Sequence, residues 1–438
     1  DVIAGTQYNL ETHLGTLTDT TIRLVAQDGQ TLLVFDDDGG EGAASKISWT
    51  ATATGTFFLE VEAFSSSDTG AYTLTVTHND DFGGSAAGAT ALTANTSQSG
   101  VIGVVGDKDW FSINVVAGQT YRVLLDTDGL PHGKATLYAS DGYTALLSGD
   151  GLGAGTDPWL IWKADATETV YVSMGGNTTE TGSYSVSYTV VDGMVATTPG
   201  SGIAAQVRVA NASNGVVLYS YQPYGSFTGG ALVAMGDVNG DGIADAITGA
   251  DAGGGPHVRV ISGANGSELM SFFAFGTSFS GGVRVASADV NGDGKDDVIA
   301  AAGPGGGPHV RVFAGNTGTE LFSFFPYSTN FSGGVFVAAG DVNGDGKADV
   351  VTGPGAGGGP DLKVTSGADG STVLLNFMAY DPAFTGGIYV GAGDVNDDGK
   401  ADVVTGPGAG GGPHVRVFNG VTGSELTAIY PYSSSFTG

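Results

Sequence analysis

The sequence predicts an all-β protein built of two β-sandwich modules followed by four-stranded β-propeller-type blades, four full blades and a half blade. Two internal repeats lead to this fold class, one with a period of about 113 residues and one of about 52. Composition agrees, because 77 of 438 residues are Gly, only 14% are charged, and 41% are hydrophobic. Such a chain has many turns and enough apolar residues to form cores.

The N-terminal half carries the longer repeat. Residues 1–8 match residues 114–121, and Trp49 matches Trp162. Apolar and polar residues alternate in both copies, as in 184–188. This alternation is typical of antiparallel sandwiches with one buried face.

These matches place a first sandwich at 1–80 and a second at 97–192. Between and after them, 79–97 and 193–202 are rich in Gly, Ala, Thr, Ser or Asn and are predicted to be linkers. Asp1 aligns with Asn114, so we expect the first sandwich to be N-terminally incomplete and to have an open sheet edge.

The C-terminal half, 203–438, carries the shorter repeat. A Phe-Ser/Thr-Gly-Gly marker recurs in each unit, and Gly-Gly-Gly-Pro-His-Val-Arg-Val recurs in three of them. Four short strands in about 50 residues are the pattern of a propeller blade. A half unit, 207–227, precedes the first full blade. In the second blade the expected strands are Val283–Ala286, Val298–Ala301, His309–Phe313 and Leu321–Tyr327.

An acidic loop begins at residues 237, 289, 341 and 394. Each copy has oxygen-bearing side chains at loop positions 1, 3, 5 and 9 and a Gly at position 6, where a tight turn needs it. Calcium is a hard cation that takes six to eight oxygen ligands, so this pattern predicts four calcium sites. Their ligands are Asp237, Asn239, Asp241 and Asp245; Asp289, Asn291, Asp293 and Asp297; Asp341, Asn343, Asp345 and Asp349; and Asp394, Asn396, Asp398 and Asp402.

The loop starts like an EF-hand but does not continue like one. An EF-hand needs a bidentate Glu at position 12, where this chain has Thr248, Ala300, Thr352 and Thr405. A β-branched run follows each loop instead, which predicts a calcium loop between two strands. The alternative is a solvated Asp-Gly hairpin without metal.

Charge and cysteine content exclude several functions. The formal charge of −30 disfavours nucleic acids and anionic membranes as partners and favours cations. Because there is no Cys, disulfides, thiolate zinc sites and cysteine nucleophiles are excluded. The sequence has no nucleophile elbow and no His-Glu-x-x-His motif. We therefore expect a non-enzymatic protein in which metal ions are the available cross-links.

The Phe-Ser-Gly-Gly, Asp-x-Asn-x-Asp-Gly-x-x-Asp and Gly-Pro markers of 203–438 resemble FG-GAP repeats, the blades of integrin α-type propellers and of many bacterial surface proteins. The resemblance implies that the four acidic loops bind calcium away from the propeller axis. With four full units and a half, the series departs from the family, which commonly closes with seven blades.

Residues 1–192, with Gly-Asp-Lys-Asp-Trp-Phe at 106–111, resemble the bacterial pre-peptidase C-terminal domain. This resemblance implies a jelly-roll module that accompanies secreted enzymes and surface proteins. It also implies a further calcium turn at Asp36, Asp37 and Asp38.

Other residues recur at the same place in each blade. The histidines are interpreted as structural and the basic residues as members of charge pairs. The aromatic series is interpreted as core between blades, with sugar stacking as the alternative. These residues are His257, His309 and His414, with Asp361 in the third blade; Arg208, Arg259, Arg311, Lys363 and Arg416; and Phe272, Phe324, Phe377 and Ile429.

Together these patterns predict a non-catalytic, calcium-stabilised extracellular or cell-surface protein of bacterial secreted type, for adhesion or assembly, including filament formation. The expected partners are calcium and other protein chains, with glycans as a further class, and neither nucleic acid nor membrane insertion. Two alternatives stay open: the accessory or targeting region of a secreted hydrolase such as a peptidase, and a carbohydrate-binding lectin.

Overall fold

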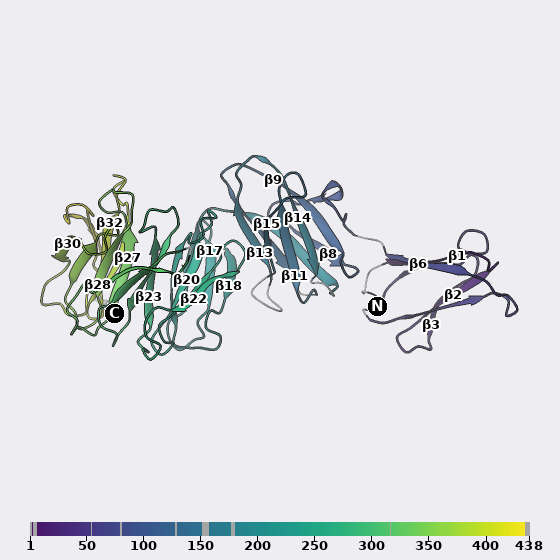
Figure 1. Cartoon of the computed structure of the whole chain (residues 1–438), viewed down its shortest axis with the longest axis horizontal. Coiled ribbons are helices and arrows are strands. Elements are labelled where there is room, and N and C mark those ends of the chain that lie inside the picture. Colours follow the sequence, from purple (N-terminus) through teal and green to yellow (C-terminus); the bar gives the residue numbers. More distant parts are fainter. Residues whose placement is uncertain are drawn as a thin grey trace. The chain divides into compact units, whose positions relative to one another are not determined.

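The protein is all-β. The computed structural model describes residues 2, 7–53, 55–78, 81–127, 129–150, 157–176, 180–315 and 317–433 (Figure 1). The one helix among them is the three-residue 3-10 turn η1 (Ala86–Gly88). No helix in this part of the chain is long and apolar enough to cross a membrane. The chain forms two compact units, one of Asp1–Ala117, Val123–Leu160 and Asp165–Thr189, the other of Gly118–Arg122, Ile161–Ala164 and Val190–Gly438.

Six strands form two three-stranded sheets that we call the first module. The sheet orders are β4-β1-β6 and β3-β2-β5. Tyr8 and Leu10 from one sheet and Ile22 and Leu24 from the other share one core, as the alternating sequence predicts. The strands are β1 (Gln7–Leu14), β2 (Thr20–Val25), β3 (Leu32–Asp36), β4 (Lys46–Thr50), β5 (Phe58–Ala63) and β6 (Tyr72–His78).

Nine strands form the second module, in two sheets of order β13-β10-β15-β8 and β12-β11-β14-β9-β7. Phe111, which is fully buried, faces Tyr184 of the opposite sheet with ring centroids 6.5 Å apart. The strands are β7 (Thr90–Ala91), β8 (Ser97–Ile102), β9 (Lys108–Val115), β10 (Thr120–Asp126), β11 (Gly133–Tyr138), β12 (Ala145–Gly149), β13 (Trp159–Lys163), β14 (Glu168–Gly176) and β15 (Gly182–Val191).

The two modules repeat the same strand register with a shift of 113 residues. Ile22 pairs with Asp36 and Val61 in the first module, while Ala135 pairs with Gly149 and Met174 in the second. The strands β7, β8 and β9 have no counterpart among the described strands of the first module. There, the bridge between Val2 and Gly55 alone repeats the pairing of Val115 with Glu168.

The C-terminal half contains four antiparallel sheets of four strands each, which we call the repeat sheets. In each, the strands follow one another in chain order, as the four-strand repeat predicts. Their bounds are β19 (Ala231–Gly236), β20 (Asp245–Ala250), β21 (His257–Ile261) and β22 (Glu268–Phe273); β23 (Val283–Ala288), β24 (Asp297–Ala302), β25 (Val310–Phe313) and β26 (Glu320–Phe324); β27 (Val335–Gly340), β28 (Asp349–Pro354), β29 (Asp361–Thr365) and β30 (Val373–Met378); and β31 (Ile388–Gly393), β32 (Asp402–Pro407), β33 (Val415–Phe418) and β34 (Glu425–Ile429).

Both segments predicted to be linkers contain regular structure, so those predictions are wrong in part. In 193–202, the strand β16 (Met194–Thr197) joins β17 (Val207–Asn211) and β18 (Val217–Tyr221) in a three-stranded sheet. The half unit is therefore completed by a strand from outside the repeat. In 79–97, η1 and β7 occur, and β7 pairs in parallel with β9. Two-residue and four-residue strands produce too little pattern to be recognised in sequence.

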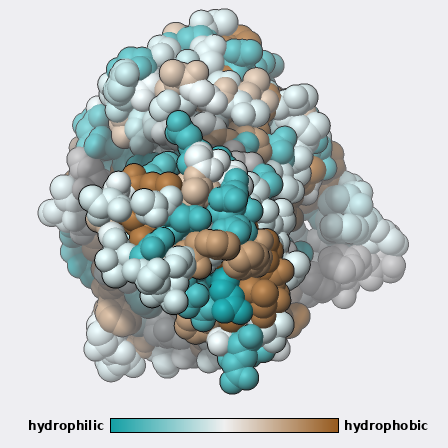
Figure 2. All heavy atoms as spheres, turned by 90° about the vertical axis from the view of Figure 1, so that its right-hand side faces the viewer, coloured by the Kyte–Doolittle hydropathy of each residue, from teal (hydrophilic) through white to brown (hydrophobic). Residues whose placement is uncertain are grey.

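Successive repeat sheets pack on one another through apolar clusters. Phe272, Phe324 and Phe377 each lie in one of these clusters, which confirms that they are core residues. Ile429, their counterpart in the last repeat sheet, is exposed. Exposed hydrophobic side chains also occur in the first module, for example Phe35 and Phe64. Figure 2, seen from the side where β1, β2 and β3 lie in Figure 1, shows hydrophobic residues at the surface among hydrophilic ones.

A Tyr that follows the last strand of one sheet contacts the next sheet. The Tyr327 hydroxyl lies 2.9 Å from the carbonyl oxygen of Thr352 and 2.8 Å from that of Asp361. Tyr224 and Tyr380 make the same pair of contacts. At the remaining seam the residue is Phe275, which lacks the hydroxyl and contacts the His309 ring.

Candidate metal centres

The sixteen predicted ligands lie at the turn between the first and second strands of each repeat sheet. Positions 1, 3 and 5 are in the turn, and position 9 is the first residue of the second strand, as with Asp245 in β20. In each of the four sheets the two strands pair along their whole length, for example from Ala231 with Ala250 to Gly236 with Asp245. The ladder therefore holds the two ends of every loop together.

In the first loop the aspartate at position 1 organises the turn. One oxygen of Asp237 accepts the amide hydrogens of Gly240 at 2.7 Å and Asp241 at 3.1 Å, and the other accepts that of Gly242 at 2.8 Å. Gly242 has φ 82, a left-handed conformation that a side chain would strain. The sequence therefore places Gly where the loop backbone bends around the carboxylate.

The other loops repeat this arrangement. Asp289, Asp341 and Asp394 accept the amide hydrogens of residues four and five positions further along. One departure is in the fourth loop, where Asp397, with φ 59, occupies the place that Gly has in the other three. The same turn thus forms four times, at a conformational cost in one copy.

The position 3 amides differ between loops. Asn239 donates to the position 5 carboxylate of Asp241 at 3.0 Å, and Asn343 does the same to Asp345. In the second loop Asn291 donates to Asp297 instead, at 3.2 Å. Asn396, the amide of the fourth loop, accepts the amide hydrogen of Asp398 at 2.9 Å.

The aspartates at position 9 are the buried members of the set. One oxygen of Asp245 accepts the amide hydrogen of Val238 within the loop, at 3.0 Å, and the other accepts that of Gly263 beyond β21, also at 3.0 Å. Burial raises the pKa of Asp245 to about 7. Asp297, Asp349 and Asp402 make the same two contacts, and burial raises the pKa of Asp297 and of Asp349 to about 6. Each therefore fastens its loop to the far end of the sheet.

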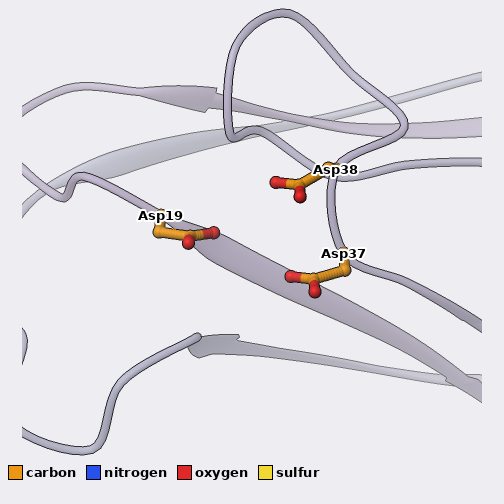
Figure 3. A group of neighbouring side chains, drawn as sticks. All are labelled: Asp19, Asp37 and Asp38. Carbon is orange, nitrogen blue, oxygen red and sulfur yellow. The ribbon is translucent and has the colours of Figure 1, made fainter.

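Among the described residues, three acidic ligand atoms lie within 4.8 Å of one another at one place, formed by Asp19, Asp37 and Asp38 of the first module (Figure 3). This group includes none of the sixteen loop residues. Asp19 precedes β2 and the other two follow β3, and these strands pair antiparallel. Partial desolvation, followed by repulsion from Asp38 and Asp19, raises the pKa of Asp37.

Asp36, which the sequence groups with Asp37 and Asp38, has a different role. Its carboxylate accepts the amide hydrogens of Gly39 at 2.9 Å and Lys46 at 2.7 Å. Asp19, in contrast, was missed by the sequence prediction. Only the pairing of β2 with β3 brings it to the acidic turn, so the available signal was the strand register.

The repeated histidines lie on separate repeat sheets and stack on aromatic rings. The ring centroids of His309 and Phe325 are 4.4 Å apart, and those of His414 and Tyr430 are also 4.4 Å apart. His257 stacks in the same way on Phe273. These contacts support the structural interpretation, although the side chains stack on the next strand rather than cap the glycine turn.

The repeated basic residues form ion pairs, as predicted. Arg259 pairs with Glu268, Arg311 with Glu320 and Arg416 with Glu425. In the third repeat sheet, Lys363 lies 3.8 Å from Asp361. Each pair joins neighbouring strands or positions within one sheet, so the set supplies no shared site.

Comparison with family models identifies an FG-GAP-like repeat at residues 289–352. This segment begins at position 1 of the second loop and ends in β28. A search of curated proteins gives no significant match.

Several solved structures are weakly similar. Rhamnogalacturonan lyase YesW has 15% identity and a TM-score of 0.34, with 69% of this chain and 65% of the lyase covered. A COPII outer coat vertex structure on membranes has 13% identity and a TM-score of 0.37, with 68% and 76% covered. The pre-peptidase C-terminal domain of a Bacillus anthracis collagenase has 19% identity and a TM-score of 0.19, with 23% and 93% covered.

The chain thus spans less than two thirds of the length of the lyase YesW. The collagenase domain matches a minor part of this chain. At TM-scores below 0.5, these likenesses do not establish a shared overall fold.

Proposed function

We propose that this chain is a non-catalytic, calcium-stabilised extracellular or cell-surface protein for adhesion or assembly. In this proposal the first and second modules are jelly-roll sandwiches and the repeat sheets are propeller-type blades. The four loops hold Ca²⁺ through the sixteen predicted ligands. Calcium would supply charge neutralisation and a cross-link inside each loop.

One observation carries the proposal: the same acidic turn forms in all four repeat sheets, with the position 1 carboxylate surrounded by backbone amides in each. A solvated hairpin needs no such repetition of acid at fixed positions. The buried position 9 aspartate fixes the loop on the sheet, so that the exposed oxygens at positions 3 and 5 are held close to position 1. The acidic group of Asp19, Asp37 and Asp38 is proposed as a fifth calcium site.

Other protein chains are the proposed macromolecular partners. The strands β5 and β6 are sheet edges in the first module, and unpaired edges favour pairing with another strand. Self-assembly through these edges is tested by light scattering of the full chain in calcium, where a strictly monomeric protein would contradict it.

Calcium dependence is tested by calorimetric melting of the full chain in 2 mM Ca²⁺ and in EGTA. Extracellular-type sites have Kd values of about 0.1 to 1 mM, so each occupied loop should add roughly 1 to 2 kcal/mol by mass action. We expect the transition of the repeat sheets to move to higher temperature in calcium. An unchanged melting curve would contradict the proposal.

Asp293→Ala tests a single site. Titration calorimetry should detect one calcium fewer than in the wild type, with the other sites unchanged, because each repeat contacts mainly its neighbours. Asp369→Ala is the matched control, since Asp369 removes the same charge from an exposed turn outside the loops. Loss of all sites in Asp293→Ala, or an equal loss in the control, would mean that the ligands are misassigned.

A further inference from the structure

A basic pocket lies on the outer face of the five-stranded sheet of the second module. Its volume is about 400 Å³, and it is lined by side chains from β9, β11, β12 and β14. Lys134 pairs with Gly175, and Gly175 with Lys108, so the two lysines flank a glycine on the central strand. Two strand spacings separate them by roughly 10 Å at the backbone.

The charge of this pocket is opposite to that of the protein. Acidic residues outnumber basic ones by 45 to 15 in the chain, yet the described lining contains two lysines and no Asp or Glu. Within the described residues neither Lys108 nor Lys134 forms an ion pair, whereas Lys46 pairs with Glu11 and Arg23 with Glu60. The pocket therefore presents two ammonium groups to an anion from outside the chain.

The rest of the lining is hydroxylic and aromatic. Ser148, Thr136 and Ser173 form one row across β12, β11 and β14, next to the lysine row. Tyr138 stands beyond them and stacks on Trp110, with ring centroids 4.5 Å apart. Neutral hydroxyls can donate to and accept from a ligand that itself carries several hydroxyls, and an aromatic ring can cover its apolar face.

We propose that this pocket binds an acidic saccharide, with the lysines on a uronate carboxylate and the three hydroxyl side chains on sugar hydroxyls. The volume falls in the range of small-ligand sites, about 300 to 1,000 Å³. An acidic peptide fits less well. Peptides are read through free backbone groups at a sheet edge, whereas β11 and β14 are paired on both sides.

A second pocket, on the other sheet of the same module, is an internal contrast. Its lining includes Asp81 and Asp126 and, among described residues, no Lys or Arg. Its volume, about 380 Å³, is nearly the same. Size therefore does not distinguish the two pockets, but charge assigns the anion to one of them.

The test is titration calorimetry of the full chain in 2 mM Ca²⁺ with a hyaluronan tetrasaccharide. Its carboxyl-reduced form is the neutral analogue, and hexaglutamate is the acidic peptide. We expect the tetrasaccharide to bind at one site per chain and both other compounds to bind at least about tenfold more weakly. Absence of tetrasaccharide binding, or equal binding of the neutral form or of hexaglutamate, would overturn the proposal.

Variants locate the site. Lys108→Ala and Lys134→Ala should each weaken tetrasaccharide binding about threefold to tenfold, since the pocket is open to solvent. Lys163→Ala, which removes the same charge from exposed Lys163 of the same module, should leave binding unchanged. Lys108→Arg should retain most of the affinity. Melting temperatures check that each variant is folded, and an equal loss in Lys163→Ala would contradict a local site.

This inference is independent of the calcium loops. Asp293→Ala should bind the tetrasaccharide with wild-type affinity. A chain without calcium binding but with a functional pocket would refute the proposed function and leave the saccharide site intact.

Discussion

The first and second modules share one strand register but differ in which residues they bury. Tyr72, Leu74 and Val76 of β6 are 42%, 36% and 55% exposed. Their counterparts in β15, namely Tyr184, Val186 and Tyr188, are 4%, 0% and 9% exposed. In the second module β8 pairs with β15 and β9 with β14, while β6 and β5 are edges. Residues of the same type and position are therefore core or surface according to the two strands beside them.

The comparison also locates a cavity. In the first module an apolar pocket of about 180 Å³ is lined by Tyr8, Leu10, Trp49 and Leu59, among others. Shifted by 113 residues, these positions are Tyr121, Val123, Trp162 and Val172 of the second module, all buried. The burial pattern of the second module thus depends on β8 and β9, and the first module lacks their contribution in its described part.

The largest expected difference between the modules is in the effect of truncating the matched tyrosines. Tyr184→Ala should cost about 3–5 kcal/mol of unfolding free energy, because it removes a buried ring and the 2.6 Å hydrogen bond that Tyr184 donates to Asp109. Tyr72→Ala should cost less than about 1 kcal/mol, since its ring is partly exposed. Urea unfolding followed by tryptophan fluorescence measures both. Equal losses would show that β6 is covered in solution.

Hydrogen exchange should sharpen the same contrast. Amides of β6 and β5 should exchange at least about tenfold faster than those of β15 and β14, because an edge strand opens with little loss of buried contacts. Exchange followed by peptide mass spectrometry of the full chain makes the comparison within one sample. Similar protection in β6 and β15 would indicate that another strand pairs with the first module.

Calcium should change the first module more than the second. Binding at Asp19, Asp37 and Asp38 should raise the melting temperature of the first module by about 2 to 4 °C at millimolar Ca²⁺. Asp37→Asn should abolish that increase, while Asp68→Asn, at an exposed acid of the same module, should retain it. A calcium shift that survives Asp37→Asn would exclude this site.

The smallest expected effect is a pH dependence without calcium. The raised pKa of Asp37 means that the folded first module binds more protons than the unfolded chain just above pH 3.8. This contribution makes the folded module less stable as the pH rises through the raised pKa. Melting in EGTA between pH 4 and pH 7 should show the decrease in wild type and a smaller one in Asp37→Asn. A stability that rises over this window for Asp37-dependent reasons would contradict the sign.

The sequence repeats were sufficient to predict the strand pattern, because a period of 113 residues carries register and a period of about 52 carries four strands. They were not sufficient for β16 and β7, which are too short to show alternation, or for Asp19, which reaches the acidic turn only through pairing. The loops themselves were predicted from spacing, but the burial of Asp245 was not. Spacing describes which oxygens are near in sequence, whereas burial depends on the turn beyond β21.

The seams between sheets have a mechanical consequence. At three seams a Tyr hydroxyl is anchored to the carbonyls of the next sheet, and the facing residue is Thr248, Thr352 or Thr405. At the fourth, Phe275 stands where the Tyr would be and Ala300 where the Thr would be. Hydrogen bonds resist sliding because they are directional, but an apolar contact lets two surfaces slip. Under a pulling force, the repeat sheets should part first between β19–β22 and β23–β26, so that tension on the chain is released at a fixed place.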